Sequence, residues 1–114
     1  MWTEVSELPG SKTFRVMLRM ETAPGSGAEF ERQWIAGARI IAREPANLGQ
    51  WLARSAEEDG VYYIVSDWVD EPRFREYEQS ARHLEHRARL HPYRTAGSMM
   101  TMNVINETTG SGRQ

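Results

Sequence analysis

Residues 61–69 (VYYIVSDWV) constrain the fold most, because they are apolar on both faces of an extended strand. Alternate side chains of a strand point to opposite faces. One face would carry Val61, Tyr63 and Val65, and the other would carry Tyr62, Ile64 and Trp68. A strand of this kind is normally covered on both faces. We therefore expect helices on one face and the sheet of a second copy, in a homodimer, on the other.

Hydrophobic spacing predicts the elements around this strand. A period of two predicts strands over 13–21, 48–55 and 97–105, and helical spacing predicts helices over 27–44, from Asp70 through Phe74 and Tyr77, and over 81–90. Ser26 and Asp70 are expected to cap helices, and Pro45 to end one. The order β-α-β-β-α-β is that of the ferredoxin-like α+β fold, with an antiparallel four-stranded sheet and helices on one face.

The composition fits one small domain and excludes several kinds of protein. Of the 114 residues, we assign 13–105 to the domain, 1–12 to a flexible N-terminal arm and 106–114 to a disordered tail. A net charge of −2 argues against a nucleic-acid partner. No apolar run approaches the ~20 residues of a membrane span, and no signal peptide is visible, so a cytoplasmic location is expected. The absence of cysteine excludes disulfides, iron–sulfur clusters and Cys-ligated zinc.

A cluster of basic side chains in residues 82–94 is the first candidate for a binding site. Four arginines stand there against one glutamate, for a local charge of +3 (four minus one), together with three histidines. A flavin phosphate or a phenolate would be attracted to such a cluster. A solvated helix face balanced by acids elsewhere is the alternative for any one arginine.

Individual side chains in and near this cluster suggest roles in a site. His86 is the candidate general acid–base, because imidazole titrates near neutrality, and His83 lies three residues before it on the same helical face. With a suitably spaced acid the two could imitate a two-His-one-carboxylate site, but no such acid is visible, so no metal is expected. Arg87 and Arg94 are the candidate ligands for phosphate or phenolate.

Aromatic side chains could form the walls of the same site. Trp68 and Tyr77 are the expected walls of a pocket between the sheet and its helices, with Trp68 also a catalytic candidate and equally well a plain core residue. Tyr93 lies on a loop and could bind substrate through its hydroxyl. Trp51 is a further candidate for binding, although packing is its commoner role.

Residues 62–74 (YYIVSDWVDEPRF) resemble the W-x-[DS]-E-x-x-[FY] signature of the antibiotic-biosynthesis monooxygenase family. The resemblance covers roughly residues 13–105. It implies a dimeric ferredoxin-like α/β barrel and an oxygenase that acts, with O2, on an aromatic polyketide.

A second stretch resembles one subgroup of that family. Residues 86–99 (HRARLHPYRTAGSM), with 45–50 (PANLGQ) upstream, are similar to the angucycline ring-opening oxygenases of the gilvocarcin, jadomycin and kinamycin pathways. This resemblance implies oxidative cleavage of a carbon–carbon bond with reduced flavin (FADH2 or FMNH2). A separate flavin reductase would supply the flavin, because the chain has no Rossmann-type glycine fingerprint to bind NADH.

The sequence departs from two other branches of the family. Quinone-forming anthrone oxygenases have an Asn four residues before the strand Trp and a Tyr six residues after it, where this chain has Ile64 and Phe74. Haem-degrading relatives have a Trp and a His where this chain has Tyr77 and Arg87, so no haem is expected. Three alternatives to the flavin-dependent oxygenase stay open: a cofactor-independent anthrone-type monooxygenase, a non-oxidative polyketide cyclase and a non-catalytic polyketide-binding protein.

Overall fold

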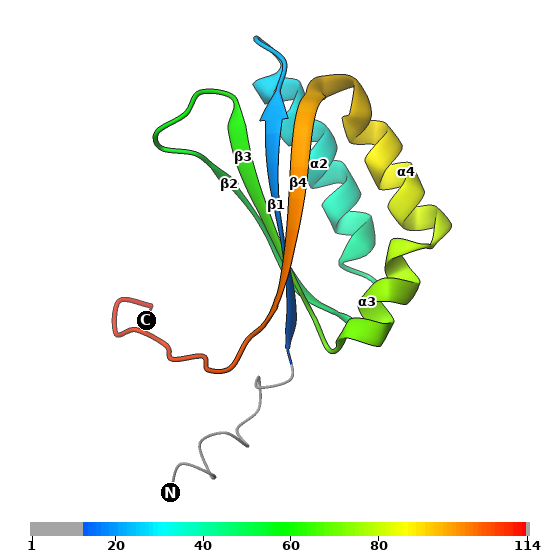
Figure 1. The fold of residues 1–114 in the computed structure, drawn as a ribbon, viewed down its shortest axis with the longest axis vertical. Coiled ribbons are helices and arrows are strands. Elements are labelled where there is room, and N and C mark those ends of the chain that lie inside the picture. Colours follow the sequence, from blue (N-terminus) through cyan, green and yellow to red (C-terminus); the bar gives the residue numbers. More distant parts are fainter. Residues whose placement is uncertain (1–12, 114) are drawn as a thin grey trace, which may run out of the picture.

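A computed structural model describes residues 13–113 as one sheet covered by helices (Figure 1). In chain order the elements are β1 (Phe14–Thr22), α2 (Gly27–Ile41), β2 (Asn47–Arg54), β3 (Val61–Trp68), α3 (Glu71–Glu78), α4 (Ala81–Leu90), the 3-10 helix η1 (His91–Tyr93) and β4 (Arg94–Asn103). The four strands are antiparallel and follow the order β2-β3-β1-β4. All the helices lie on one face, which confirms the predicted ferredoxin-like α+β fold. No helix within 13–113 is long and apolar enough to cross a membrane.

Both ends of the chain were expected to lack regular structure. The predicted arm, residues 1–12, lies outside the described residues. Residues 104–113 contain no helix or strand, although the backbone N–H of Val104 still donates to the carbonyl of Thr13 at 2.9 Å. Disorder of the tail stays a prediction.

The core lies between the helices and one face of the sheet. The side chains of β1 that alternate toward this face are the ones predicted: Phe14, Val16, Leu18 and Met20. Trp68 from β3 and Phe30 from α2 are the largest side chains that are almost wholly buried. Each anchors one of two adjoining hydrophobic clusters, which share this layer. The alternation of the strands therefore decides which side chains can reach a site beneath the helices.

Several boundaries differ from the predicted ones. Helix α2 ends at Ile41, three residues before the expected end, because the chain turns through residues 42–46 around Pro45. Ser26 precedes α2 but makes no side-chain capping bond, whereas Asp70 Oδ1 accepts from the backbone N–H of Arg73 at 2.9 Å as predicted.

Strand β4 begins at Arg94, three residues earlier than expected. A register shift beside Thr22 lets that residue pair with Arg94, and the N–H of Ala23 donates to the Tyr93 carbonyl at 2.9 Å. These bonds extend the sheet toward the end of η1. Arg94 thereby starts a strand instead of lying in a loop.

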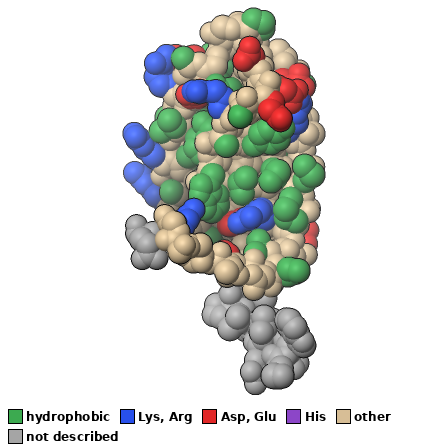
Figure 2. Space-filling view, turned by 90° about the vertical axis from the view of Figure 1, so that its left-hand side faces the viewer, with side chains coloured by type: hydrophobic (Ala, Val, Ile, Leu, Met, Phe, Trp, Pro, Cys, Tyr) green, Lys and Arg blue, Asp and Glu red, His purple; other side chains and the backbone are tan. Residues whose placement is uncertain are grey.

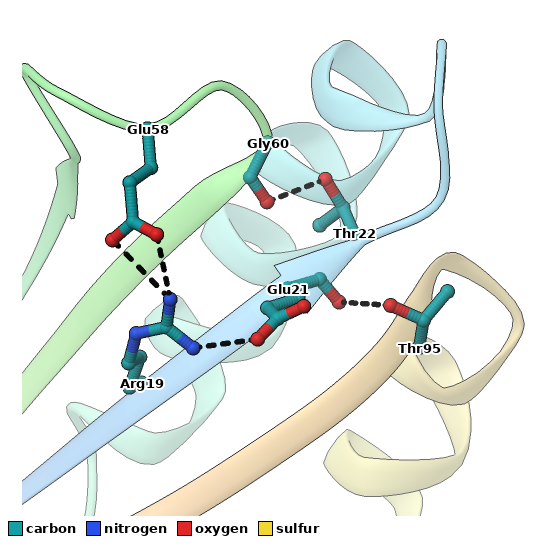
Figure 3. Close-up of polar contacts among 6 residues, drawn as sticks. All are labelled: Arg19, Glu21, Thr22, Glu58, Gly60 and Thr95. Carbon is teal, nitrogen blue, oxygen red and sulfur yellow. Dashed lines mark hydrogen bonds and ion pairs between the residues drawn. The ribbon is translucent and has the colours of Figure 1, made fainter.

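Polar contacts fasten the end of β1 to its neighbours (Figure 3). The guanidinium of Arg19 bonds Glu21 at 2.6 Å and Glu58 in the β2–β3 turn at 3.1 Å. The Thr22 hydroxyl donates to the Gly60 carbonyl at 2.9 Å, and Gly60 adopts a positive φ of 75° that suits a glycine in this turn. These contacts hold the β2–β3 hairpin against the middle of the sheet.

The other face of the sheet has no helix over it. Figure 2 shows this face, with hydrophobic side chains gathered across its middle and charged groups around them. Trp51 and Met100 are exposed on it, at 48% and 54%, and Met17 and Val65 lie between them in register. Arg15 and Asp67 form a two-bond ion pair beside this apolar area, at 2.7 and 2.8 Å. This outer face is where the sequence predicts the contact of a homodimer.

Candidate active site

A cavity of about 260 Å³ lies between the sheet and the helices, where the sequence predicts a pocket. All four strands contribute to it on one side, and α2, α3 and α4 on the other. Its apolar lining includes Val16, Leu18, Trp34, Ile64, Leu90 and Met99. A lining of this kind suits a flat aromatic ligand.

Trp68 and Tyr77 form one wall of the cavity. Their rings stack at a centroid distance of 4.8 Å, and Phe74 packs on Trp68 at 5.4 Å. Trp68 is 1% exposed, and its indole N–H donates to the hydroxyl of Ser66 at 3.0 Å. The stack gives the cavity a rigid aromatic side against which a planar molecule can lie.

The hydroxyl of Tyr77 is buried and has no hydrogen-bond partner among residues 13–113. Burial, and then the negative charge of Glu44, raises the pKa of this phenol, so it stays protonated and available as a donor. Trp68 and Tyr77 also line a second, more polar hollow of about 370 Å³, beside the ion pair of Glu44 and Arg82. The aromatic wall therefore contacts both hollows.

His86 and His83 come from α4 and line the cavity together. The His83 ring meets the Tyr77 ring edge-on at 5.2 Å. His86 Nδ1 is buried against Gly37 of α2 without a hydrogen-bond partner among residues 13–113, which leaves Nε2 as the nitrogen that a ligand could meet. Burial, followed by the charges of His83 and Arg89, lowers the pKa of His86 to about 4. His86 is therefore neutral at pH 7, and its pKa lies below the near-neutral value predicted from the sequence.

The positive charge of the cavity comes from Arg87 and Arg94. Both line it, and neither forms an ion pair with an acid in the described part of the chain. Glu78 also lines the cavity, but its carboxylate is bonded to Arg75 at 3.1 Å. The two arginines can therefore attract an anionic oxygen of a ligand.

Six of the eight candidate residues meet in this cavity: Trp68, Tyr77, His83, His86, Arg87 and Arg94. The other two do not line it. Trp51 lies on the outer face of the sheet, and Tyr93 packs against the core cluster around Phe30. The structure thus separates Trp51 and Tyr93 from the other candidates.

Trp34, Gln50 and Ser66 are among the lining residues to which the sequence assigned no role in a site. Trp34 of α2 is both buried and part of the lining. Gln50 and Ser66 are polar residues inside strands, and they face one another across β2 and β3. Along their strands, Gln50 and Ser66 alternate with Trp51 and Asp67, which lie on the outer face. This alternation was the sequence signal that could have placed Gln50 and Ser66 on the face beneath the helices.

Among the described residues, no group of three or more His, Asp or Glu side chains is arranged to hold a metal ion. His83 and His86 lie on one helix face, but no carboxylate joins them in such a group. The cavity therefore presents imidazole, phenol and guanidinium groups to a ligand.

Comparison with known proteins identifies relatives of this chain. Residues 13–89 match the model of the family described as antibiotic biosynthesis monooxygenase. Deoxynogalonate monooxygenase of Streptomyces nogalater is 29% identical over 98 residues, which cover 82% of this chain and 83% of that protein.

Solved structures have the same fold. SnoaB, a cofactor-independent oxygenase from Streptomyces nogalater, superposes in a mutant form with a TM-score of 0.76 and 23% identity, over 84% of this chain and 96% of that one. PA3566 from Pseudomonas aeruginosa superposes with a TM-score of 0.73 and 14% identity, over 85% and 98% of the two chains.

These relatives correct the expected cofactor. The prediction of reduced flavin, FADH2 or FMNH2, is wrong, because SnoaB is a cofactor-independent oxygenase. The separate reductase was expected only as the source of that flavin. The prediction of a monooxygenase is confirmed, since the matched residues 13–89 are most of the chain and the chain belongs to the antibiotic biosynthesis monooxygenase family.

Proposed function

We propose that this protein is a cofactor-independent monooxygenase that oxidises a polycyclic phenolic polyketide, of the anthrone type, to a quinone. The observation that carries the proposal is the apolar cavity itself. It is walled by Trp68 and Tyr77, rimmed by Arg87 and Arg94, and contains a neutral His86. A flat, acidic, electron-rich molecule fits such a cavity in shape and in charge.

The substrate supplies the electrons in this reaction. A base removes a proton from the activated CH2 group of the anthrone, which gives an enolate that can reduce triplet O2 by one electron. The resulting radicals combine to form a C–O bond, and the hydroperoxide loses water to leave a carbonyl. One CH2 group and one O2 become one C=O group and one water, so no external reductant is needed.

Side chains of the cavity can assist each stage. Neutral His86 accepts the proton through Nε2, and the substrate anion beside it then stabilises the imidazolium that forms. Arg87 and Arg94 attract the enolate oxygen. Tyr77 keeps its proton and can donate a hydrogen bond to the substrate or to the distal oxygen of the hydroperoxide, which leaves as water.

Segments 86–99 and 45–50 suggest a more specific substrate, an angucycline-type phenol. Ring opening of that substrate would place oxygen into a cleaved carbon–carbon bond instead of forming a quinone. Both substrates are phenolic and polycyclic, and both fit the same cavity chemistry. Products identified by mass spectrometry with an anthrone and with a dehydrorabelomycin-like phenol distinguish the two reactions.

The test measures oxygen uptake by the purified protein with dithranol, without added flavin, against the slow oxidation of dithranol in buffer. We expect uptake that depends on the protein and a quinone product. His86→Ala should lower turnover by about 10²–10⁴-fold, and Arg94→Ala should mainly raise KM. Equal conversion under nitrogen would contradict the oxygenase, and binding without conversion would support the non-catalytic protein.

We also propose a homodimer, formed through the outer face of the sheet, and a cytoplasmic location. The exposed Trp51 and Met100 on that face support the dimer, because monomers rarely leave so apolar a sheet face uncovered. Pairing two such faces would form the α/β barrel that the family resemblance implies. The location rests on the sequence alone.

A further inference from the structure

Gln50 and Ser66 form a polar pair in the otherwise apolar, sheet-side lining of the cavity. They are direct partners in the antiparallel register of β2 and β3, and both side chains line the cavity. Partners of this kind have Cβ atoms about 4.5–5.5 Å apart. A single ligand can therefore contact both side chains at once.

The hydroxyl of Ser66 is left as a hydrogen-bond donor. Its oxygen accepts the indole N–H of Trp68 at 3.0 Å. A serine hydroxyl has one proton of its own to donate. None of the hydrogen bonds formed within residues 13–113 uses that proton. The bond from Trp68 thus orients Ser66, and its O–H remains available to an acceptor in the cavity.

The amide of Gln50 is left with its oxygen as an acceptor. Its Nε2 donates to the main-chain carbonyl of Ala38 on α2 at 3.0 Å. A carbonyl only accepts, so this contact fixes which end of the amide is nitrogen. No donor within the described residues 13–113 bonds Oε1. The two strands thus present one free donor and one free acceptor side by side.

We infer that Ser66 and Gln50 bind the keto oxygen of the substrate and a hydroxyl group next to it. This inference rests on the function proposed above and names a narrower substrate class: aromatic ketones that carry a hydroxyl peri to the keto group. The Ser66 O–H donates to the keto oxygen, and Gln50 Oε1 accepts from the peri-hydroxyl. As the ketone becomes an enolate, its oxygen gains charge and the Ser66 bond strengthens, so the pair favours the reactive form.

The first test compares two substrates that differ only in the peri-hydroxyl groups, dithranol and unsubstituted anthrone. Wild type should prefer dithranol in kcat/KM, and Gln50→Leu should reduce that preference by about tenfold, as expected for one lost hydrogen bond that leaves a buried group unpaired. Gln33→Leu is the matched control, because Gln33 bonds Glu29 on α2 and does not line the cavity. A preference that is the same in Gln50→Leu and wild type overturns the inference.

Ser66 needs a variant pair, because Ser66→Ala alone also removes the acceptor of the buried Trp68 indole and could destabilise the fold. Trp68→Phe removes that indole N–H. Trp68→Phe/Ser66→Ala should then show a further loss of about tenfold in kcat/KM for dithranol relative to Trp68→Phe. An equal kcat/KM in these two variants contradicts the role of Ser66.

A binding measurement separates this inference from the proposed reaction. Quenching of tryptophan fluorescence reports binding of danthron, which has the peri-hydroxyls, and of anthraquinone, which has none. Tighter binding of danthron by wild type, reduced in Gln50→Leu, supports the pair whether or not oxygen is consumed. Failure of oxygen uptake with that preference intact contradicts the proposed oxygenase alone. Equal binding of both quinones by wild type overturns the assignment of the pair.

Discussion

The imidazole of His86 on α4 packs directly against Gly37 on α2, with its buried Nδ1 facing the glycine. A methyl group at position 37 would overlap the ring, so the glycine is what lets the two helices enclose a histidine at this point. The contact fixes which imidazole nitrogen remains for the cavity. It also couples the proposed base to the packing of α2 and α4.

Gly37→Ala should therefore destabilise the protein although alanine is the better helix former. Overlap with the buried ring costs about 1–3 kcal/mol, against an intrinsic gain of about 1 kcal/mol for Gly to Ala in a helix. In a His86→Ala background the overlap is gone, and Gly37→Ala should become stabilising. Urea unfolding of wild type, Gly37→Ala, His86→Ala and the double variant measures this reversal of sign. Equal effects in both backgrounds would show that the two side chains do not interact.

The lowered pKa of His86 predicts a pH-dependent contribution to stability. The pKa is about 4 in the folded chain, against an ordinary value of about 6.5, so the unfolded chain binds more protons between these values. Stability contributed by His86 is then complete above pH 6.5, falls as the pH drops toward 4, and is lost below it. The loss is at most about 3 kcal/mol.

Other groups also titrate in this range, so the contribution of His86 has to be measured as a difference between wild type and a His86 variant. Burial also lowers the pKa of His83. The stability that carboxylates such as Glu31 contribute through a lowered pKa is lost at lower pH. Unfolding free energies of wild type and His86→Gln, measured at several pH values from 4 to 7, isolate the contribution of His86. Parallel profiles for the two proteins would contradict the lowered pKa.

Much of the fold could be predicted from the chain, because alternation and helical spacing are local properties. The even-numbered side chains of β1 lie under the helices as predicted, and Asp70 caps its helix. His83 and His86 meet because residues three apart share a helix face. The spacing within each element was therefore sufficient for these positions.

The remaining errors concern contacts between elements. Alternation along β2 puts Trp51 and Leu52 on opposite faces, but the sequence of the strand does not say which face of the sheet the helices cover. Gln50 and Ser66 look like ordinary polar strand residues until the register of β2 and β3 makes them neighbours. The pKa of His86 depends on its burial against Gly37, which is distant in sequence.

Trp68→Phe and Trp68→Ala should separate the packing of Trp68 from its hydrogen bond. Trp68→Ala removes a side chain that is 1% exposed and stacked on Tyr77, so we expect a loss of about 3–5 kcal/mol in unfolding free energy. Trp68→Phe keeps an aromatic ring in that stack and should cost clearly less. Thermal or urea unfolding measures both. A Phe variant as unstable as the Ala variant would show that the bond to Ser66, not the stack, carries the stability.

Treatment with a chelator should leave oxygen uptake unchanged. The proposed reaction takes its electrons from the substrate, and within residues 13–113 no set of His, Asp and Glu side chains is arranged for a metal. Dialysis against EDTA, followed by the dithranol assay and by metal analysis of the protein, tests this expectation. Stoichiometric iron or copper in the active protein, with activity lost on its removal, would contradict it.

The outer face of the sheet predicts a homodimer that a charge can break. Light scattering at micromolar concentration should give about twice the chain mass of 13.1 kDa. Trp51→Glu places a carboxylate beside Val65 on the apolar outer face of the sheet and should shift the protein to a monomer, because burying that charge in the contact is unfavourable. Leu84→Glu is the matched control, since Leu84 is similarly exposed, at 55%, but lies on α4. If Leu84→Glu alone produces monomers, the contact involves the helices; if wild type itself is a monomer, the face-to-face dimer is wrong.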